Sequence, residues 1–216
     1  VRLTGSVSVA ALEKSLQALV DRHETLRTTF EGVDEDLVQV IAASRKISLS
    51  LLSIENTSST DGEAKLWELI RTEASAAFDL GRGPLIRARL FRLGPQEHVL
   101  VITTHHILVD GWSQNVLQRE LWTNYEAFAE ANEPSLPPLD IQYADFVHWQ
   151  REWLSSESAK QELNFWREQL ASPLPLMNLP TGRPGRNRAA SPAPMETLLL
   201  PEVLTRSLKS LSKSQD

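Results

Sequence analysis

Apolar residues recur at two different periods along the chain, and these periods predict which segments are helices and which are strands. After Ser8, which can cap a helix, apolar side chains return at helical spacing. A second helix is predicted after Asp61 as its cap, and a third over residues 113–131. The apolar faces are Leu12, Leu16, Leu19 and Val20 in the first helix; Leu66, Leu69, Ile70 and Ala74 in the second; and Val116, Leu117, Leu121, Tyr125 and Phe128 in the third.

Alternating and β-branched runs predict strands between these helices. The runs 26–30 and 37–41 are predicted to pair as a hairpin. A second hairpin is predicted from the runs 85–93 and 98–106, which a short turn separates. The last of these runs is apolar on both alternating faces up to Thr103, which is typical of a central strand covered on both sides.

The C-terminal part of the chain changes character twice. Residues 143–170 have a helical pattern rich in aromatic side chains, which indicates a core and interface stripe. Residues 173–195 are rich in Pro, Gly and Arg without apolar periodicity, so a linker is predicted there. Residues 196–216 have the pattern of one strand and one helix without a core of their own, which is typical of a truncated unit.

Composition fits a globular protein and excludes several classes of function. The 216 residues are 41% hydrophobic and 23% charged, with a formal net charge of −6. This charge, without a basic block, argues against nucleic-acid binding. The absence of cysteine excludes a disulfide framework, a thiol nucleophile and a Cys-ligated zinc site. No apolar run has the length of a membrane span, and a cytoplasmic location is expected.

The stretch TTHHILVDGWS, residues 103–113, concentrates the side chains that carry chemistry. Neighbours on a strand face opposite sides, so His105 and His106 are not expected to share a metal ion, and no metal site is predicted. A Ser-His-Asp triad lacks a Gly-x-Ser-x-Gly elbow. The favoured interpretation is a single working histidine at a strand end. Asp110 would cap the turn or pair with a buried arginine, and Gly111 would allow a positive φ or the close approach of a ligand.

The segment HHILVDGWS resembles the His-His-x-x-x-Asp-Gly signature of condensation domains of nonribosomal peptide synthetases, which belong to the chloramphenicol-acetyltransferase-like superfamily. RHETLRTTF at 22–30 and YADFVHW at 143–149 are similar to two further motifs of that family. FDLGRGPLIRARL and FWREQL are similar to its connecting segments, in the same order. The resemblance covers essentially the whole chain.

The resemblance implies an α/β fold, an α+β two-layer sandwich of the acetyltransferase-like type in which helices cover a mixed sheet. Residues 1–172 would form an N-terminal lobe, 173–195 the linker, and 196–216 the first strand and helix of a truncated C-terminal lobe. The family's site lies in a tunnel between two lobes. The chain by itself is therefore expected to be a weak or inactive catalyst.

The resemblance also implies a reaction, which is amide formation. The amine of an aminoacyl thioester on a downstream carrier protein attacks an acyl or peptidyl thioester on an upstream carrier, with an L-donor and an L-acceptor. Phosphopantetheine arms carry both substrates, and no cofactor binds the domain directly. The implied partners are the two peptidyl carrier domains, an adenylation domain and the missing C-terminal lobe, with neither nucleic acid nor membrane.

Residue roles follow from the matched motif. His106 would be catalytic, either accepting a proton or orienting the amine, and the N–H of Gly111 would be a candidate oxyanion donor. Asp110 would be structural and paired with Arg27, while His105 and Trp112 would pack. The alternatives are a related epimerisation or acyltransferase domain, and a non-catalytic domain that docks carrier or tailoring proteins. Retention of the second histidine and of Asp-Gly favours catalysis.

Overall fold

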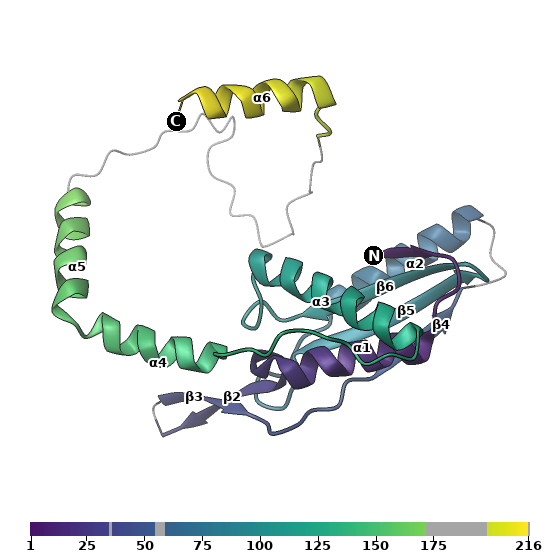
Figure 1. Cartoon of the computed structure of the whole chain (residues 1–216), viewed down its shortest axis with the longest axis horizontal. Helices are drawn as coiled ribbons and strands as arrows, with labels where there is room; N and C mark the ends of the chain where they lie inside the picture. The colour runs from purple at the N-terminus through teal and green to yellow at the C-terminus, as the bar shows by residue number, and fades with distance from the viewer. Residues whose placement is uncertain (35, 55–58, 172–197, 216) are drawn as a thin grey trace, which may run out of the picture. The chain divides into compact units, whose positions relative to one another are not determined.

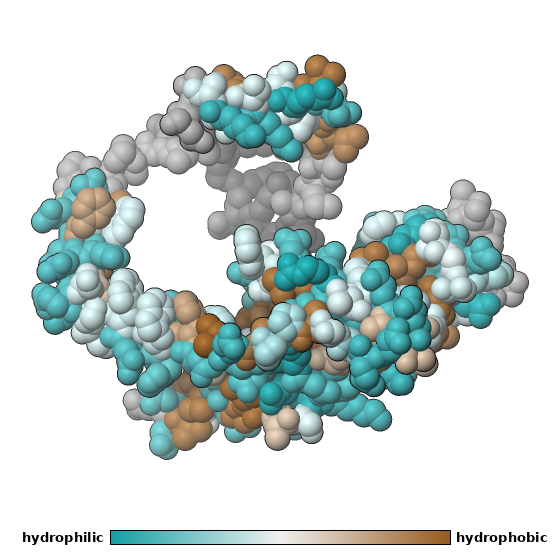
Figure 2. Space-filling model, in the orientation of Figure 1, coloured by the Kyte–Doolittle hydropathy of each residue, from teal (hydrophilic) through white to brown (hydrophobic). Residues whose placement is uncertain are grey.

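The computed structural model describes residues 1–34, 36–54, 59–171 and 198–215, and it divides the chain into two compact units, Val1–Trp166 and Arg167–Asp216. The predicted linker at 173–195 lies outside the described residues. The second unit contains the predicted C-terminal helix, α6 (Glu202–Gln215). Its apolar side chains are exposed, as the brown residues on this helix show in Figure 2.

The first unit is built on a mixed four-stranded sheet with the order β1-β6-β5-β4, in which only β4 and β5 run parallel. A separate antiparallel pair consists of β2 and β3. Both predicted hairpins are confirmed, as β2–β3 and β5–β6, whereas β1 and β4 were not predicted. The strands are β1 (Arg2–Thr4), β2 (Thr28–Val33), β3 (Asp36–Ile41), β4 (Leu49–Ser53), β5 (Ile86–Gly94) and β6 (Glu97–Thr104).

The predicted helices are present with shifted ends. Ser8 caps α1 as predicted, through its side chain and the Ala11 N–H. The second helix already begins at Ser59, so Asp61 lies in its first turn and is not the cap. A short 3₁₀ helix, η1, occupies the start of the first predicted strand. The ranges are α1 (Val9–Arg22), η1 (Glu24–Arg27), α2 (Ser59–Ser75), α3 (Gly111–Ala129), α4 (Tyr143–Leu154) and α5 (Glu157–Gln169).

Helices cover both faces of the sheet, and strand alternation decides which side chains each helix meets. Leu90 and Leu100 face each other across β5 and β6 and pack with α1 and α3, which lie side by side in Figure 1. The next pair, Phe91 and Val99, points to the opposite face and packs against Leu66 of α2. The α/β class and the covered mixed sheet are thus confirmed, and α2 adds a layer to the two predicted.

Two stretches depart from the predicted burial. On α2, Ala74 is exposed and the neighbouring Glu73 is buried instead. On α4 no residue is buried, and the aromatic rings of Tyr143, Phe146 and Trp149 stack along the helix surface. The aromatic stripe therefore lies outside the core of this unit.

The register of β4 on β5 provides a matched test of the core. Leu90, which is fully buried, pairs with Leu51, which is 49% exposed. Leu90→Ala should lower the free energy of unfolding by about 2–5 kcal/mol, because it leaves a cavity. Leu51→Ala removes the same atoms from a half-exposed site and should cost clearly less. Urea unfolding measures both, and equal losses would contradict the packing described.

Candidate functional site

The connection from β6 to α3, residues 105–110, is anchored to the core at its middle. Leu108 and Val109 are 8% and 7% exposed and belong to the main hydrophobic cluster. At the start of the connection, the His105 N–H donates to the Leu85 carbonyl (2.9 Å), and the Leu108 N–H donates to the His105 carbonyl (3.0 Å). These contacts fix the backbone on both sides of His106.

The two histidines have different environments, as predicted. His105 is half-buried, its ring meets the edge of Phe78 at 6.0 Å between centroids, and its Nδ1 accepts the Ile107 N–H (3.1 Å). His106 is exposed, and among the described residues its ring nitrogens have no hydrogen-bond partner. Because β6 ends at Thr104, the turn that follows the strand separates the two rings, and strand alternation is not the cause.

Asp110 is the N-cap of α3, which is one of the two structural roles that the sequence left open for it. Its Oδ1 accepts from the Ser113 N–H (2.8 Å) and from the Ser113 hydroxyl (2.7 Å). The hydrogen bond from the Ser113 backbone, followed by that from the Ser113 side chain, lowers the pKa of Asp110 below its usual value. The carboxylate therefore serves the start of the helix on which Gly111 and Trp112 lie.

The predicted ion pair between Asp110 and Arg27 is not formed. Arg27 instead donates from Nη1 to the Ala42 carbonyl (2.5 Å), and its Nη2 lies 3.4 Å from a Glu24 carboxylate oxygen. Arg27 thus ties η1 to the end of β3. The reason is that Ser113 lies only three residues from Asp110 in the sequence. A hydrogen bond between these two residues restricts the conformational freedom of the chain less than a pair with the distant Arg27 would.

Gly111 and Trp112 also differ from expectation. Gly111 is the first residue of α3 and is not among the described glycines with positive φ, which are Gly5 and Gly83. A Cβ added at Gly111 would meet no atom within 4 Å, so the remaining prediction, room for a ligand, stays open. Trp112 is 81% exposed, so within the described residues it is not a packing residue.

A cavity of about 310 Å³ lies where the turn, α3, η1 and α4 meet, and His106, Asp110 and Trp112 contribute to its wall. No site role was predicted for the other polar residues of this wall, which are His23, Thr25, Ser113 and Tyr143. The first and last of these lie in the two segments, RHETLRTTF and YADFVHW, that flank the His-His stretch in sequence. Their position in these two segments is the sequence feature from which a site role could have been predicted.

A buried carboxylate holds His23 in this wall. The Nε2 of His23 lies 2.6 Å from Oε2 of Glu120, whose side chain is 7% exposed, and the Arg22 Nε lies 3.2 Å from the same oxygen. A buried carboxylate needs such partners to offset its desolvation. Glu120 precedes Leu121 on the buried face of α3. Its place in the helical period is therefore the sequence feature that could have predicted a buried carboxylate here.

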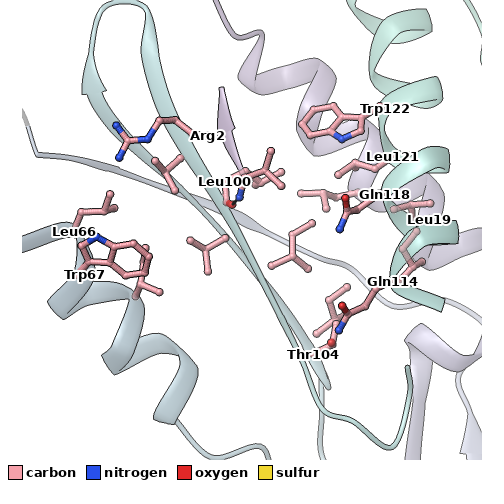
Figure 3. Close-up of a pocket in the computed structure, with 18 residues that line it drawn as sticks. Arg2, Leu19, Leu66, Trp67, Leu100, Thr104, Gln114, Gln118, Leu121 and Trp122 are labelled. Carbon is pink, nitrogen blue, oxygen red and sulfur yellow. Dashed lines mark hydrogen bonds between the residues drawn. The ribbon is translucent and has the colours of Figure 1, made fainter. Parts of the chain in front are cut away.

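A larger cavity of about 500 Å³ opens on the other side of the unit, between α2, β6 and α3 (Figure 3). Leu66 and Trp67 of α2 form one wall, and Gln114, Gln118 and Trp122 of α3 form the opposite one. None of the six predicted site residues lines it. Its wall is mostly aliphatic and aromatic, and no histidine lines it.

The described residues form neither a metal-binding cluster nor a membrane-spanning helix. In these parts of the chain, no three His, Asp or Glu side chains gather in an arrangement able to hold a metal ion. No described helix combines the length and apolarity required to cross a membrane.

Comparison with known proteins places this architecture in a family. The model of the condensation domain matches residues 1–216, and the chain belongs to this family of nonribosomal peptide synthetase domains. It is 43% identical over 212 residues to one of the linear gramicidin synthase proteins of Brevibacillus parabrevis, a match that covers 98% of this chain and 3% of that protein. The chain thus spans only a small part of this much longer relative.

Solved structures agree on the fold. The X-domain in its complex with OxyB from teicoplanin biosynthesis is 33% identical, with a TM-score of 0.72 over 83% of this chain and 39% of that chain. The epimerization domain from the third module of tyrocidine synthetase B has a TM-score of 0.72 over 82% of this chain and 40% of that chain. At 21% identity the second likeness shows the fold alone.

The cap on α3 predicts a pH-dependent loss of stability. The folded-state pKa of Asp110 is depressed, so its stabilisation is present above the unfolded value of about 3.9 and is lost as pH falls through the folded value. Asp110→Ala should therefore lower the melting temperature at pH 7, and its difference from the wild type should shrink as the pH falls below the unfolded-state pKa and through the depressed folded-state pKa.

Two variants control this experiment. Asp110→Asn keeps an acceptor for the Ser113 N–H and should retain most of the stability at pH 7. His106→Ala removes an exposed ring without hydrogen bonds to the described residues and should change the melting temperature little. If thermal unfolding followed by circular dichroism gave the same loss for Asp110→Ala and His106→Ala, the structural role of Asp110 would be wrong.

Proposed function

We propose that the chain carries the catalytic histidine of an amide-forming reaction between two carrier-bound thioesters. The observation that carries this proposal is the position of His106. It is exposed in the wall of a cavity, on a turn whose neighbours are fixed by backbone hydrogen bonds and by buried side chains. Membership of the condensation-domain family supplies the reaction type.

In this reaction the nitrogen of a carrier-bound aminoacyl group attacks the carbonyl carbon of an upstream acyl or peptidyl thioester. A C–N bond forms, the C–S bond breaks, the nitrogen loses a proton, and the departing thiolate of the phosphopantetheine arm gains one. His106 either accepts the proton from nitrogen or holds the amine in line with the carbonyl. Its ring nitrogens have no protein partner among the described residues, so they remain available to the substrate.

Gly111 is the proposed neighbour of the thioester oxygen. As the first residue of α3 it has an N–H that no carbonyl within the helix can accept, and among the described residues this N–H has no partner. A backbone N–H at this place can stabilise the negative charge that develops on oxygen. The open space around its Cα supports the approach of a substrate.

The substrates proposed are an L-configured donor and an L-configured acceptor, each on a phosphopantetheine arm. The proposed partners are accordingly an upstream and a downstream peptidyl carrier domain and an adjacent adenylation domain. The relatives support this proposal because they are large synthetases in which a match of this length is a small fraction of the chain.

A second candidate function is docking of another protein without catalysis. It is favoured by the 33% identity to the X-domain, whose structure was determined in complex with OxyB. The catalytic proposal is preferred because this chain keeps an exposed second histidine together with a capping aspartate and a glycine that leaves room. Docking would be insensitive to removal of the His106 ring, so one variant separates the two candidates.

His106→Ala in the intact protein should lower the rate of amide formation by about 10²- to 10⁴-fold if the ring is a general base. The matched control is His148→Ala, because His148 is an exposed histidine of α4 that is not part of the cavity wall. The rate is measured by mass spectrometry of the product released from the downstream carrier. A wild-type rate in His106→Ala would exclude the catalytic role.

The solvent deuterium isotope effect on kcat, measured in the wild type and in His106→Ala, separates the two roles left open for His106. If the ring is the general base, it transfers a proton in the transition state, and the isotope effect should differ between the two proteins. If the ring only orients the amine, His106→Ala should lower the rate and leave the isotope effect unchanged.

A further inference from the structure

The segment FDLGRGPLIRARL, residues 78–90, accepts the His105 N–H through the Leu85 carbonyl and also contributes two side chains near the His105 turn, Phe78 and Arg87. Arg87 lies on β5, where its guanidinium reaches the C-terminal end of α2. Its Nε lies 2.5 Å from the carboxylate of Glu73, and its Nη2 donates to the carbonyls of Glu73 (3.1 Å) and Ala76 (2.9 Å). Arg89 pairs with the same carboxylate. Since the Glu73 side chain is only 3% exposed, these charge-assisted bonds hold Arg87 in a fixed position.

Phe78 rests on this fixed guanidinium. The Arg87 Cζ lies 3.8 Å from the centroid of the Phe78 ring, a close cation–π contact. The ring also packs, half-buried, against the main hydrophobic cluster. The guanidinium and the core thus both restrict the orientation of the ring.

The ring of Phe78 in turn meets the ring of His105. The two rings are nearly perpendicular, at 83° and 6.0 Å between centroids. This contact and the hydrogen bond from the Ile107 N–H to Nδ1 both constrain the His105 ring. When the ring is neutral, that hydrogen bond places its proton on Nε2.

The orientation of His105 bears directly on His106, the next residue. The Ile107 N–H that holds the His105 ring flanks His106 on its other side, so the two constraints span the turn. If the His105 ring turns over, the Ile107 N–H loses its acceptor, and the backbone at His106 loses one of the hydrogen bonds that fix it. The direction of the His106 side chain would then be less tightly set.

We propose that Phe78, held between Arg87 and His105, is a positioning residue that sets the direction of the His106 side chain. Phe78 does not line the cavity, so it acts through His105 and not on the substrate. The effect on catalysis rests on the proposed function of His106. The effect on the His106 environment does not, so the two can fail separately.

The test compares Phe78→Leu with Phe78→Tyr, and uses Phe30→Leu as the matched control. Phe30 is also half-buried against the main cluster, but it makes no ring contact with His105. Histidine ring signals are recorded by NMR on the 216-residue chain and assigned by single His→Gln variants. Phe78→Leu should shift the signals of both His105 and His106. Phe78→Tyr, which keeps a ring, and Phe30→Leu should leave the His106 signal unchanged.

Kinetics of the intact protein provide the second measurement. Phe78→Leu should lower kcat by about tenfold with KM within about twofold, because a misdirected His106 affects the chemical step more than binding. Phe78→Tyr should restore kcat, and Phe30→Leu should keep it. If Phe78→Leu fails to fold, Arg87→Lys keeps the charge beside Glu73 but loses the planar stack, and the same shifts are expected.

An unchanged His106 signal in a folded Phe78→Leu or Arg87→Lys variant would overturn the positioning role. So would an equal shift in Phe30→Leu, since the effect would then be a general loss of packing. A His106 signal that shifts in Phe78→Leu, in a protein whose wild type has no condensation activity, would support the positioning role and reject the proposed function.

Discussion

The direction of His106 depends on a six-residue connection that has little freedom. Strand β6 must end and α3 must begin between His105 and Asp110, with every buried backbone group satisfied on the way. Leu108 and Val109 anchor the segment in the core, and the Asp110 carboxylate closes it by capping α3. What remains exposed is the side chain of His106 and its immediate surroundings. The turn therefore exposes one of two adjacent histidines, His106, in the wall of the cavity.

Two buried carboxylates near this turn fix the orientation of side chains that packing alone would not fix. Glu120 on α3 holds His23 in the cavity wall, and Glu73 on α2 holds Arg87 beneath Phe78. A buried ion pair is weak evidence for stability, because desolvation offsets most of the attraction, but it does impose a single geometry. The pair Glu120–His23 connects α3 to the start of η1, and the pair Glu73–Arg87 connects α2 to β5. The desolvation free energy of these buried groups is expected at a site that requires side chains with fixed orientations.

Much of the framework was predictable, since it follows from local periodicity. The face of Leu12, Leu16, Leu19 and Val20 is buried as its spacing requires, and both hairpins form. The short strand Arg2–Thr4 was missed because three residues that are largely exposed carry no period. The partner of Asp110 was missed for a different reason: a long-range pair with Arg27 and a local cap on Ser113 are both compatible with the same residues. Only the three-dimensional position of Arg27, beside Ala42, decides between them.

The cap also engages the Asp110 carboxylate away from His106. In a Ser-His-Asp triad the carboxylate accepts a hydrogen bond from the histidine and stabilises its charged form. Here the Asp110 carboxylate accepts from Ser113, and among the described residues no acid contacts His106. The ring therefore lacks, within the described parts of the chain, the partner that would fix its tautomer and stabilise the imidazolium. In the reaction proposed above, a positioning role for His106 would depend on the contacts that hold this turn, among them those of His105 with Ile107 and Phe78.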